Sequence, residues 1–349
     1  MTSPYEHNPI ETPKDNLEYV AVDKKWHKIP VSHQLYLVIA ILLILLGSAM
    51  FSVLKENSQF ITDDNEKYKT TDNTVNPKDE NNKTSFTFPE VSITGNSAYV
   101  LDIRNNQTLF SYNADKVMPL ASITKLMTAL LSYEIMDANA PVDVVQRATR
   151  QESALGLSTN DIFTHRSMAE LILLSSANDG AYALANVAGK LLDTNRPTES
   201  FVAAMNVRAE ELGLSDTNFK NPTGLDISAR EAGAVGTAKD VANLLAYIVN
   251  NYPHLLTITR EEGVRIEAST GGYIDATNTN LHVDRITGLI GSKTGYTDLA
   301  GGNLTVAYNA GLDRPIAVVV LGSTRFERFT DVEKLIRATN QILVEPKDE

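Results

Sequence analysis

A run of about twenty uncharged and mostly apolar residues, LYLVIAILLILLGSAMFSVL at Leu35–Leu54, constrains this chain more than any other feature of its sequence. At a rise of ~1.5 Å per residue, a helix of this length spans the ~30 Å hydrocarbon core of a bilayer. A core helix of a globular protein would show a polar stripe, which this run lacks. We therefore expect one N-terminal transmembrane helix that remains uncleaved. The alternative, a signal peptide cleaved after Ala49, is disfavoured by the roughly 34 residues that precede the apolar run.

Charged residues on the two sides of this run predict its orientation. Lys24, Lys25 and Lys28 lie just before it, whereas one lysine and several acidic residues follow it. Positive residues favour the cytoplasmic side, so we expect a single-pass cell-membrane protein with a cytoplasmic N-terminus and an extracellular or periplasmic remainder. Residues 55–85 are rich in Asn, Asp, Thr and Lys, which predicts a disordered linker. The expected parts are a cytoplasmic tail at 1–34, the anchor at 35–54, the linker at 55–85 and a globular domain at 86–349.

Composition and absent motifs narrow the chemistry. The chain has 31 Lys+Arg against 43 Asp+Glu, a net charge of −12 that argues against a nucleic-acid binder, which needs a basic face. It has no cysteine, which excludes disulfides, Cys-ligated zinc and thiol catalysis. No GxxxxGK[ST], HExxH or GxSxG pattern occurs, and the 6 histidines are never spaced i, i+4. We therefore expect no metal and no cofactor, and any nucleophilic catalysis would activate a Ser or Thr without a histidine.

From about Phe86 the sequence has the periodicities of a globular domain. Apolar runs predict strands near both ends of this region, and apolar residues at helical spacing predict helices in the middle. Ser167–Glu170 has the form of a capping box, which predicts a helix start at Ser167. We expect a mixed α/β fold whose sheet joins N- and C-terminal strands. The expected strands are 98–102, 108–112, 289–294, 303–308 and 316–321, and the expected helices begin near Ser122 and cover 167–174, 180–192 and about 330–343.

Three short patterns in this domain fit serine chemistry. Ser122–Lys125 (SITK) places a hydroxyl and an amine three residues apart at a helix start, on one face. A lysine that is desolvated and near other cations can be neutral and accept the serine proton. Ser176–Asn178 (SAN), in a break between two helices, offers a second hydroxyl and an amide. Lys293–Gly295 (KTG), on a strand, offers a positive charge, a hydroxyl and a glycine that lets a substrate backbone approach closely.

Each pattern is weak on its own, because the chain contains further matches. Ser52–Lys55 repeats the S-x-x-K spacing at the end of the apolar run, and Ser158–Asn160 repeats the S-x-N spacing. Ser122 could also be an ordinary helix cap, and Lys125 and Lys293 could be solvated lysines. The three patterns occur in order within one domain and with matching flanks, which favours the chemical interpretation.

With their flanks, these motifs resemble those of the penicillin-binding serine D-alanyl-D-alanine carboxypeptidases, which are related to the class A β-lactamases. The resemblance covers about residues 97–343 and implies a β-lactamase/transpeptidase-like fold, an antiparallel sheet with a helical subdomain. The family commonly has a histidine before Gly236, where this chain has Arg230–Ala232, so we expect a local difference in that loop. The segments that carry the resemblance are PLASITKLMTALL around Ser122, LILLSSANDGAYALA around Asn178, FKNPTGLD at Phe219–Asp226, NTNLH at Asn278–His282 and GSKTGYTDLAGGNL around Lys293.

The resemblance implies a role for each matching residue. Ser122 would be the acylated nucleophile, Lys125 its general base, and Ser176 a proton relay to the leaving amine. Asn178 would hold the substrate amide, and the backbone N–H groups of Ser122 and Tyr296 would form the oxyanion hole. The residues that would bind the rest of the substrate, including its terminal carboxylate, are Lys293, Thr294, Gly295, Tyr296 and Arg328, with Arg325 as an alternative to Arg328.

The implied function is that of a membrane-tethered D,D-carboxypeptidase that removes the terminal D-alanine of peptidoglycan stem peptides through a Ser122 acyl-enzyme. β-Lactam antibiotics would mimic the D-alanyl-D-alanine end and act as inhibitors. A D,D-endopeptidase that cuts D-alanyl crosslinks shares every motif and stays an alternative. A non-catalytic wall-binding protein is disfavoured by the intact set of motif residues. A β-lactamase is also disfavoured, because no carboxylate between the second and third motifs has the context of a deacylating residue; those considered are Glu199, Glu210, Glu211 and Glu231.

Overall fold

The computed structural model describes residues 88–344. The expected anchor at Leu35–Leu54, the tail before it and the linker after it lie outside these residues. Within 88–344, no helix combines the length and the apolar character needed to cross a membrane. The structure thus covers nearly all of the domain expected at 86–349.

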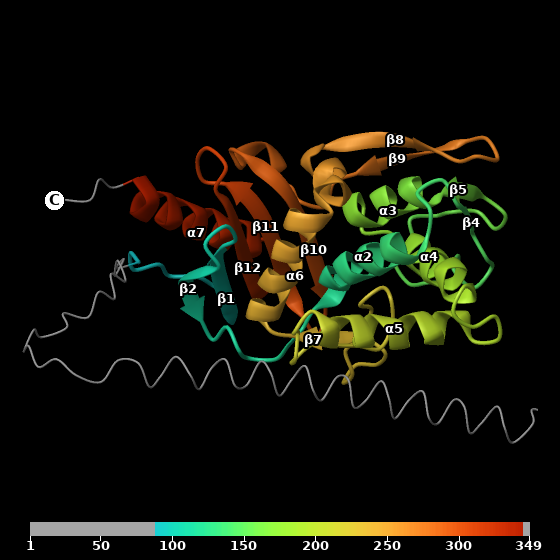
Figure 1. The fold of residues 1–349 in the computed structure, drawn as a ribbon, viewed down its shortest axis with the longest axis horizontal. Helices are drawn as coiled ribbons and strands as arrows, with labels where there is room; N and C mark the ends of the chain where they lie inside the picture. The colour runs from blue at the N-terminus through green and yellow to red at the C-terminus, as the bar shows by residue number, and fades with distance from the viewer. Residues whose placement is uncertain (1–87, 345–349) are drawn as a thin grey trace, which may run out of the picture. The chain divides into compact units, whose positions relative to one another are not determined.

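A five-stranded antiparallel sheet joins the two ends of the described chain (Figure 1). Its N-terminal strands, drawn in blue-green, lie beside C-terminal strands drawn in orange and red. This arrangement confirms the predicted sheet and the mixed α/β fold. In the order in which they lie side by side, the strands are β10 (Leu289–Thr297), β11 (Gly301–Asn309), β12 (Pro315–Ser323), β1 (Ser97–Asp102) and β2 (Gln107–Tyr112).

Successive side chains of the central strands point to opposite faces of the sheet, and this explains why both faces are covered. In β12, the odd-numbered residues 317–321 belong to the larger hydrophobic core, and the even-numbered residues 316–320 belong to a second core on the opposite face. Successive side chains of a strand point to opposite faces, so a strand that is apolar at every position needs a cover on each side. Helix α6 (Ala238–Asn251) covers the first face, and α7 (Glu327–Val344) covers the second (Figure 1).

Most of the chain between β2 and β10, apart from α6, forms a helical subdomain beside the sheet (Figure 1). Its central helix, α2 (Lys125–Ile135), is buried from Lys125 to Ser132 and contacts the four helices that follow it in the chain. The other helices are α3 (His165–Leu174), α4 (Asn178–Lys190), α5 (Pro197–Glu211) and the 3₁₀ helices η1 (Ala121–Thr124), η2 (Pro253–Arg260) and η3 (Val283–Arg285). The strands of the three small sheets are β3 (Met118–Pro119) with β7 (Ala234–Gly236) and β6 (Asn218–Phe219), β4 (Pro141–Asp143) with β5 (Ile162–Thr164), and β8 (Gly263–Glu267) with β9 (Tyr273–Thr277).

Helix α3 begins earlier than predicted, because Ser167–Glu170 is not its capping box. The helix starts at His165, and the N-cap is Thr164, whose side-chain oxygen accepts a hydrogen bond of 3.1 Å from the backbone N–H of Ser167. Thr164 has the extended backbone that a cap requires. Ser167 therefore supplies a backbone donor in the first turn rather than the cap itself. Similarly, α4 begins at Asn178 rather than Gly180.

Candidate active site

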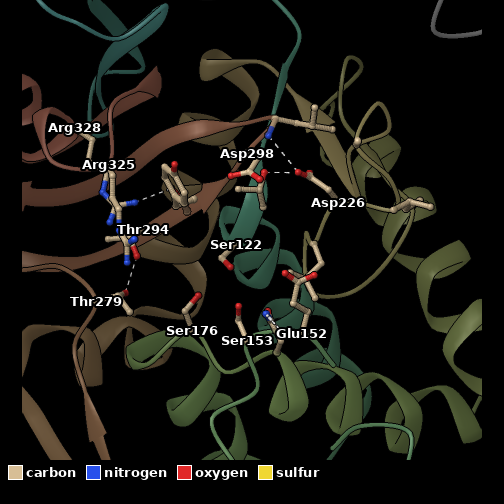
Figure 2. Close-up of a pocket in the computed structure, with 18 of the residues that line it drawn as sticks. Ser122, Glu152, Ser153, Ser176, Asp226, Thr279, Thr294, Asp298, Arg325 and Arg328 are labelled. Carbon is tan, nitrogen blue, oxygen red and sulfur yellow. Dashed lines mark hydrogen bonds between the residues drawn. The ribbon is translucent and has the colours of Figure 1, made fainter. Parts of the chain in front are cut away.

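A cavity of 830 Å³ collects residues from η1, the start of α4, strand β10 and several loops. All three sequence motifs reach it, through Ser122, through Ser176 and Asn178, and through Thr294–Tyr296. Figure 2 shows Ser122 near the middle of the cavity, with Ser176 close by. The lysines of the first and third motifs lie behind this lining and are buried. The fold thus brings together the motifs that were predicted to work together.

Ser122 lies on the 3₁₀ turn that leads into α2 and does not cap the helix. The N-cap of η1 is Leu120, and no side chain caps either η1 or α2. The simpler interpretation of Ser122 as a helix cap is therefore wrong. The residue before it, Ala121, has a φ of +47°, a left-handed conformation that costs energy in a non-glycine residue. Gly224 makes room for this turn, because a Cβ at that position would overlap the carbonyl oxygen of Ala121.

The side-chain nitrogen of Lys125 is wholly buried among three oxygen atoms. Nζ lies 2.8 Å from Oγ of Ser122, 2.7 Å from Oδ1 of Asn178 and 2.8 Å from the carbonyl oxygen of Thr223. Burial, followed by the nearby charge of Lys293, lowers the pKa of Lys125 well below its usual value. A neutral amine has two N–H groups, which the two carbonyl oxygens accept, and one lone pair, which then faces the hydroxyl of Ser122. Lys125 is therefore not a solvated lysine, and its geometry suits a general base.

The break between α3 and α4 presents Ser176 to the cavity. Ser176 has a φ of +62°, and its Oγ accepts a hydrogen bond of 2.9 Å from Nζ of Lys293. Asn178, the first residue of α4, accepts from Lys125 through Oδ1 and donates through Nδ2 to the carbonyl oxygen of Glu152 at 2.8 Å. Both polar atoms of the Asn178 side chain thus have partners within the protein. Its contact with a substrate amide stays a prediction.

Strand β10 supplies the second buried lysine. Lys293 is 1% exposed, and its Nζ also donates to the carbonyl oxygen of Thr294 at 3.0 Å. Burial and the charge of Arg328 lower the pKa of Lys293 to about 7. The hydroxyl of Thr294 donates to Oγ1 of Thr279 at 2.6 Å. A lysine with this pKa can hold an anion or exchange a proton near neutral pH.

Gly295 lets β10 pass close to the nucleophile. A Cβ at Gly295 would lie 3.1 Å from the backbone nitrogen of Ser122, a tight contact, and 2.9 Å from the carbonyl oxygen of Leu120, which is too close. The backbone of Gly295 and Tyr296 therefore runs alongside Ser122. An oxyanion hole made of the N–H groups of Ser122 and Tyr296 requires this proximity.

Arg328 and Arg325 both line the cavity, and they differ in burial. Arg328 is 7% exposed, and its Nη1 donates to the carbonyl oxygen of Gly295 at 2.7 Å. Its Nε has no hydrogen-bond partner within residues 88–344. Burial and the charge of Arg325 lower the pKa of Arg328 to about 10. Arg325 is exposed, with its guanidinium 5.4 Å from the ring centre of Tyr296. Arg328 thus places a buried positive charge in the wall of the cavity, which suits anion binding.

Several parts of the active site were not predicted. Thr223 acts through its backbone oxygen, so its residue type gives no signal, although the FKNPTGLD segment that contains it was recognised. Thr279 lies in the NTNLH segment, which had been given no role. Three carboxylate residues also line the cavity, and none of them belongs to the three catalytic motifs: Glu152, Asp226 and Asp298.

The carboxylates considered for a β-lactamase lie elsewhere in the described chain. Three of them are on α5, and Glu231 forms an ion pair of 2.8 Å with Lys220. Glu231 also pairs with Ser228 in a short bridge within the loop where a local difference was expected. Between 88 and 344, none of the four carboxylates lines the cavity: Glu199, Glu210, Glu211 and Glu231.

Comparisons with known proteins agree with this geometry. A family model described as D-alanyl-D-alanine carboxypeptidase, peptidase S11, matches residues 82–324. The chain is 31% identical over 255 residues to D-alanyl-D-alanine carboxypeptidase DacF of Bacillus subtilis (strain 168), an alignment that covers 71% of this chain and 62% of DacF. It is 32% identical over 267 residues to a D-alanyl-D-alanine endopeptidase of Escherichia coli (strain K12), covering 72% of this chain and 78% of that relative.

A solved structure shows the same fold. Penicillin-binding protein D2 of Listeria monocytogenes, in its cefotaxime-bound form, is 31% identical to this chain with a TM-score of 0.61. The match covers 72% of this chain and 98% of that protein. Fold, motifs and family match coincide over the same residues, so the chain belongs to the D-alanyl-D-alanine carboxypeptidase family of serine peptidases, peptidase S11.

Proposed function

We propose that this protein removes the terminal D-alanine from peptidoglycan stem peptides through an acyl-enzyme on Ser122. The observation that carries the proposal is the placement of Nζ of Lys125, 2.8 Å from Oγ of Ser122, with two carbonyl oxygens accepting its N–H groups. This arrangement directs the lone pair of a neutral amine at the hydroxyl proton.

The reaction follows from these positions. Lys125 takes the proton as Oγ of Ser122 forms a bond to the carbonyl carbon between the two D-alanines. Backbone N–H groups of Ser122 and Tyr296 stabilise the oxyanion, and such a donor typically lowers the barrier by about 2.7–4 kcal/mol. When the C–N bond breaks, Lys293 passes a proton through Ser176 to the leaving amine, along the 2.9 Å hydrogen bond. Water then attacks the ester and loses a proton, which returns to Lys293 through Ser176, while Oγ of Ser122 leaves with the proton held by Lys125 and the shortened peptide is released.

The leaving D-alanine carries a carboxylate, and three residues are suited to bind it. Lys293 contributes a buried cation, Thr294 a hydroxyl, and Arg328 a buried guanidinium with an unpartnered Nε in the described chain. Hydrogen bonds to charged groups contribute about 1.5–3 kcal/mol each, which is enough to select a peptide with a free C-terminus.

Covalent labelling tests the nucleophile. We expect a fluorescent penicillin to form one adduct on the wild-type protein, seen by intact mass, because Listeria penicillin-binding protein D2 is solved with cefotaxime bound. Ser122→Ala should abolish the adduct. Ser153→Ala is the matched control, since Ser153 is an exposed serine of the same cavity outside the motifs. An adduct that persists in Ser122→Ala would contradict the proposal.

A D,D-endopeptidase is the second candidate, favoured by the match to the E. coli endopeptidase over 78% of that relative. Both reactions use the same nucleophile and differ in the leaving group. The two are separated by giving the protein a stem pentapeptide and a crosslinked muropeptide dimer in parallel. Release of free D-alanine identifies the carboxypeptidase, and conversion of dimer to monomers identifies the endopeptidase.

We also propose that Leu35–Leu54 anchors the enzyme in the cell membrane, with the domain that contains Ser122 outside. The support is the length and apolar character of the run together with the lysines that precede it. The full chain should remain in the membrane fraction after an alkaline wash, and protease added to intact spheroplasts should degrade its catalytic domain. Release into the soluble fraction would contradict the anchor.

A further inference from the structure

The loop that gives Lys125 its third oxygen partner folds around the side chain of Asn221, two residues before Thr223. Oδ1 of Asn221 accepts three hydrogen bonds: from the backbone N–H of Thr223 at 3.1 Å, from the hydroxyl of Thr223 at 3.0 Å and from the backbone N–H of Gly224 at 2.7 Å. Its Nδ2 donates to the carbonyl oxygen of Leu225 at 2.8 Å. As in an Asx turn, one side chain therefore fixes the backbone on both sides of the carbonyl group that contacts Lys125.

The peptide unit between Thr223 and Gly224 transmits this contact to the active site. The peptide bonds within residues 88–344 are all trans, so the C=O and N–H groups of each peptide unit point in opposite directions. The N–H of Gly224 faces Asn221. The C=O of the same unit, that of Thr223, therefore faces the other way, where Nζ of Lys125 lies 2.8 Å from its oxygen. Asn221 thus determines the direction of this carbonyl group.

The neighbouring peptide unit, between Pro222 and Thr223, has the same arrangement. Its N–H donates to Asn221. Its C=O, that of Pro222, accepts a hydrogen bond of 2.7 Å from Oγ1 of Thr128 on α2. Thr128 lies three residues after Lys125, so the two carbonyl groups meet the same side of this helix. The loop is therefore held between Asn221 on one side and α2 on the other.

The direction of the Thr223 carbonyl group matters because it decides where the lone pair of Lys125 points. Of the two N–H groups of the neutral amine, one is accepted by Asn178 and the other by Thr223. Without the second acceptor, the amine is free to rotate and to present an N–H group, rather than its lone pair, to Ser122. A carbonyl oxygen also stabilises the protonated amine, so loss of this contact would lower the pKa of Lys125 further.

We propose that Asn221 is a positioning residue that aims the carbonyl oxygen of Thr223 at the amine of Lys125 and so keeps the lone pair of that amine on the nucleophile. This inference rests on the proposed function, because it requires that Lys125 takes the proton of Ser122. Among residues 88–344, Asn221 is not part of the cavity lining. It therefore acts through the loop and not through contact with a substrate.

The rate of acylation by penicillin, measured by stopped flow as a function of pH, tests this role. A fit of the profile gives the pH of the acidic limb and the limiting rate constant of the correctly protonated enzyme. In Asn221→Ala, we expect the limiting rate constant to fall about tenfold and the acidic limb to move about one pH unit lower, because Lys125 loses a charge-assisted hydrogen bond. Lys293 and Asp179, the charges that act on Lys125, remain in place.

Two further variants of Asn221 separate positioning from stability. Asn221→Asp keeps an acceptor oxygen for the three donors, so its limiting rate constant should stay close to that of wild type. Its added negative charge should move the acidic limb to higher pH, opposite to the shift in Asn221→Ala. Asn221→Ser has a shorter hydroxyl that makes this turn more weakly, so it should shift the limb in the same direction as Asn221→Ala but less.

Asn206 provides the matched control, because it holds the start of the same loop without reaching Lys125. Its Oδ1 accepts from the backbone N–H of Phe219 at 2.7 Å. Its Nδ2 donates to the carbonyl oxygens of Phe219 at 2.8 Å and of Val202 at 3.1 Å. Asn206→Ala should lower the temperature of thermal unfolding, as Asn221→Ala does. It should leave the acidic limb and the limiting rate constant at their wild-type values.

The outcomes separate the positioning role from the proposed function. An acidic limb that stays at the wild-type pH in Asn221→Ala would overturn the positioning role, whatever the loss of stability, and leave the proposed function standing. If Asn221→Ala does not fold, an unshifted limb in Asn221→Ser would overturn it instead. An equal shift in Asn206→Ala would also overturn it, because loosening the loop anywhere would then be sufficient. Wild-type protein that penicillin does not acylate at Ser122 would overturn the proposed function and this inference with it.

Discussion

Lys125 and Lys293 are two buried lysines in one active site, and their surroundings differ. Nζ of Lys125, on α2, meets a hydroxyl and two carbonyl oxygens, with Ser122 among the partners. Nζ of Lys293, on β10, donates to Ser176 and to the backbone of Thr294. Burial lowers the pKa of both. The comparison teaches that burial makes an amine give up its proton more readily, whereas its partners decide which proton it moves.

The largest expected effect follows from removing the neutral state of Lys125. Lys125→Arg keeps a cation but cannot lose its proton, so acylation should fall by about 10³-fold or more. Stopped-flow measurement of penicillin acylation gives the rate, and thermal unfolding shows whether the variant is folded. A folded variant that acylates within tenfold of wild type would show that the proton of Ser122 goes elsewhere.

Compared with Lys125, Lys293 should contribute less to the rate of acylation and more to substrate binding. Lys293→Met removes a charge but keeps most of the length of the side chain, so kcat/KM for a D-alanyl-D-alanine peptide should fall by about 30- to 100-fold. The loss should be smaller for an ester substrate, because its leaving alcohol needs less protonation than an amine. An equal loss of kcat/KM for the ester and the amide would contradict the proton transfer from Lys293 through Ser176.

The pH profile distinguishes the two lysines in a single experiment. Lys125 acts without its proton, so kcat/KM should rise on the acidic side as Lys125 deprotonates. Lys293 acts with its proton, so kcat/KM should fall as pH rises through about 7, the pKa of Lys293. Lys293→Arg keeps its charge, so its activity relative to wild type should increase about tenfold between about pH 6 and pH 8. An unchanged alkaline limb would assign that limb to another group.

The smallest expected difference separates the two arginines. Arg328→Gln should raise KM about tenfold, because it removes the buried cation with a free donor. Arg325→Gln should raise KM about two- to threefold, because Arg325 is exposed and screened. Steady-state kinetics on one peptide compares them directly. A larger rise in KM for Arg325→Gln than for Arg328→Gln would assign the binding of the terminal carboxylate to Arg325 instead.

The sheet and the motif residues were predictable because their signals are local. The continuous apolar run of β12 and the S-x-x-K spacing around Ser122 depend on residues close together in the chain. The start of α3 was misassigned for the same reason, since Thr164 and Ser167 can both cap and only the backbone of Thr164 decides.

The three carboxylates that line the cavity could not be predicted as a group, because they come from three separate loops. Glu152 precedes the second motif, Asp226 follows α5, and Asp298 follows the third motif. Asp226 and Asp298 lie in segments that carry the family resemblance, but only the tertiary fold shows that all three carboxylates line one cavity. The third partner of Lys125 was hidden as well, because it is the backbone oxygen of Thr223.

The contact between Lys125 and Thr223 has a consequence for how the enzyme matures. The two residues are 98 positions apart in the chain, so the contact forms only when distant segments close. Closing long loops is slow relative to forming local structure. A partly folded chain would have Ser122 and Lys125 on a nascent helix while the amine remains hydrated and protonated. Ser122 would thus become reactive only at the end of folding. The rate at which penicillin-reactive protein appears would measure the last step of refolding.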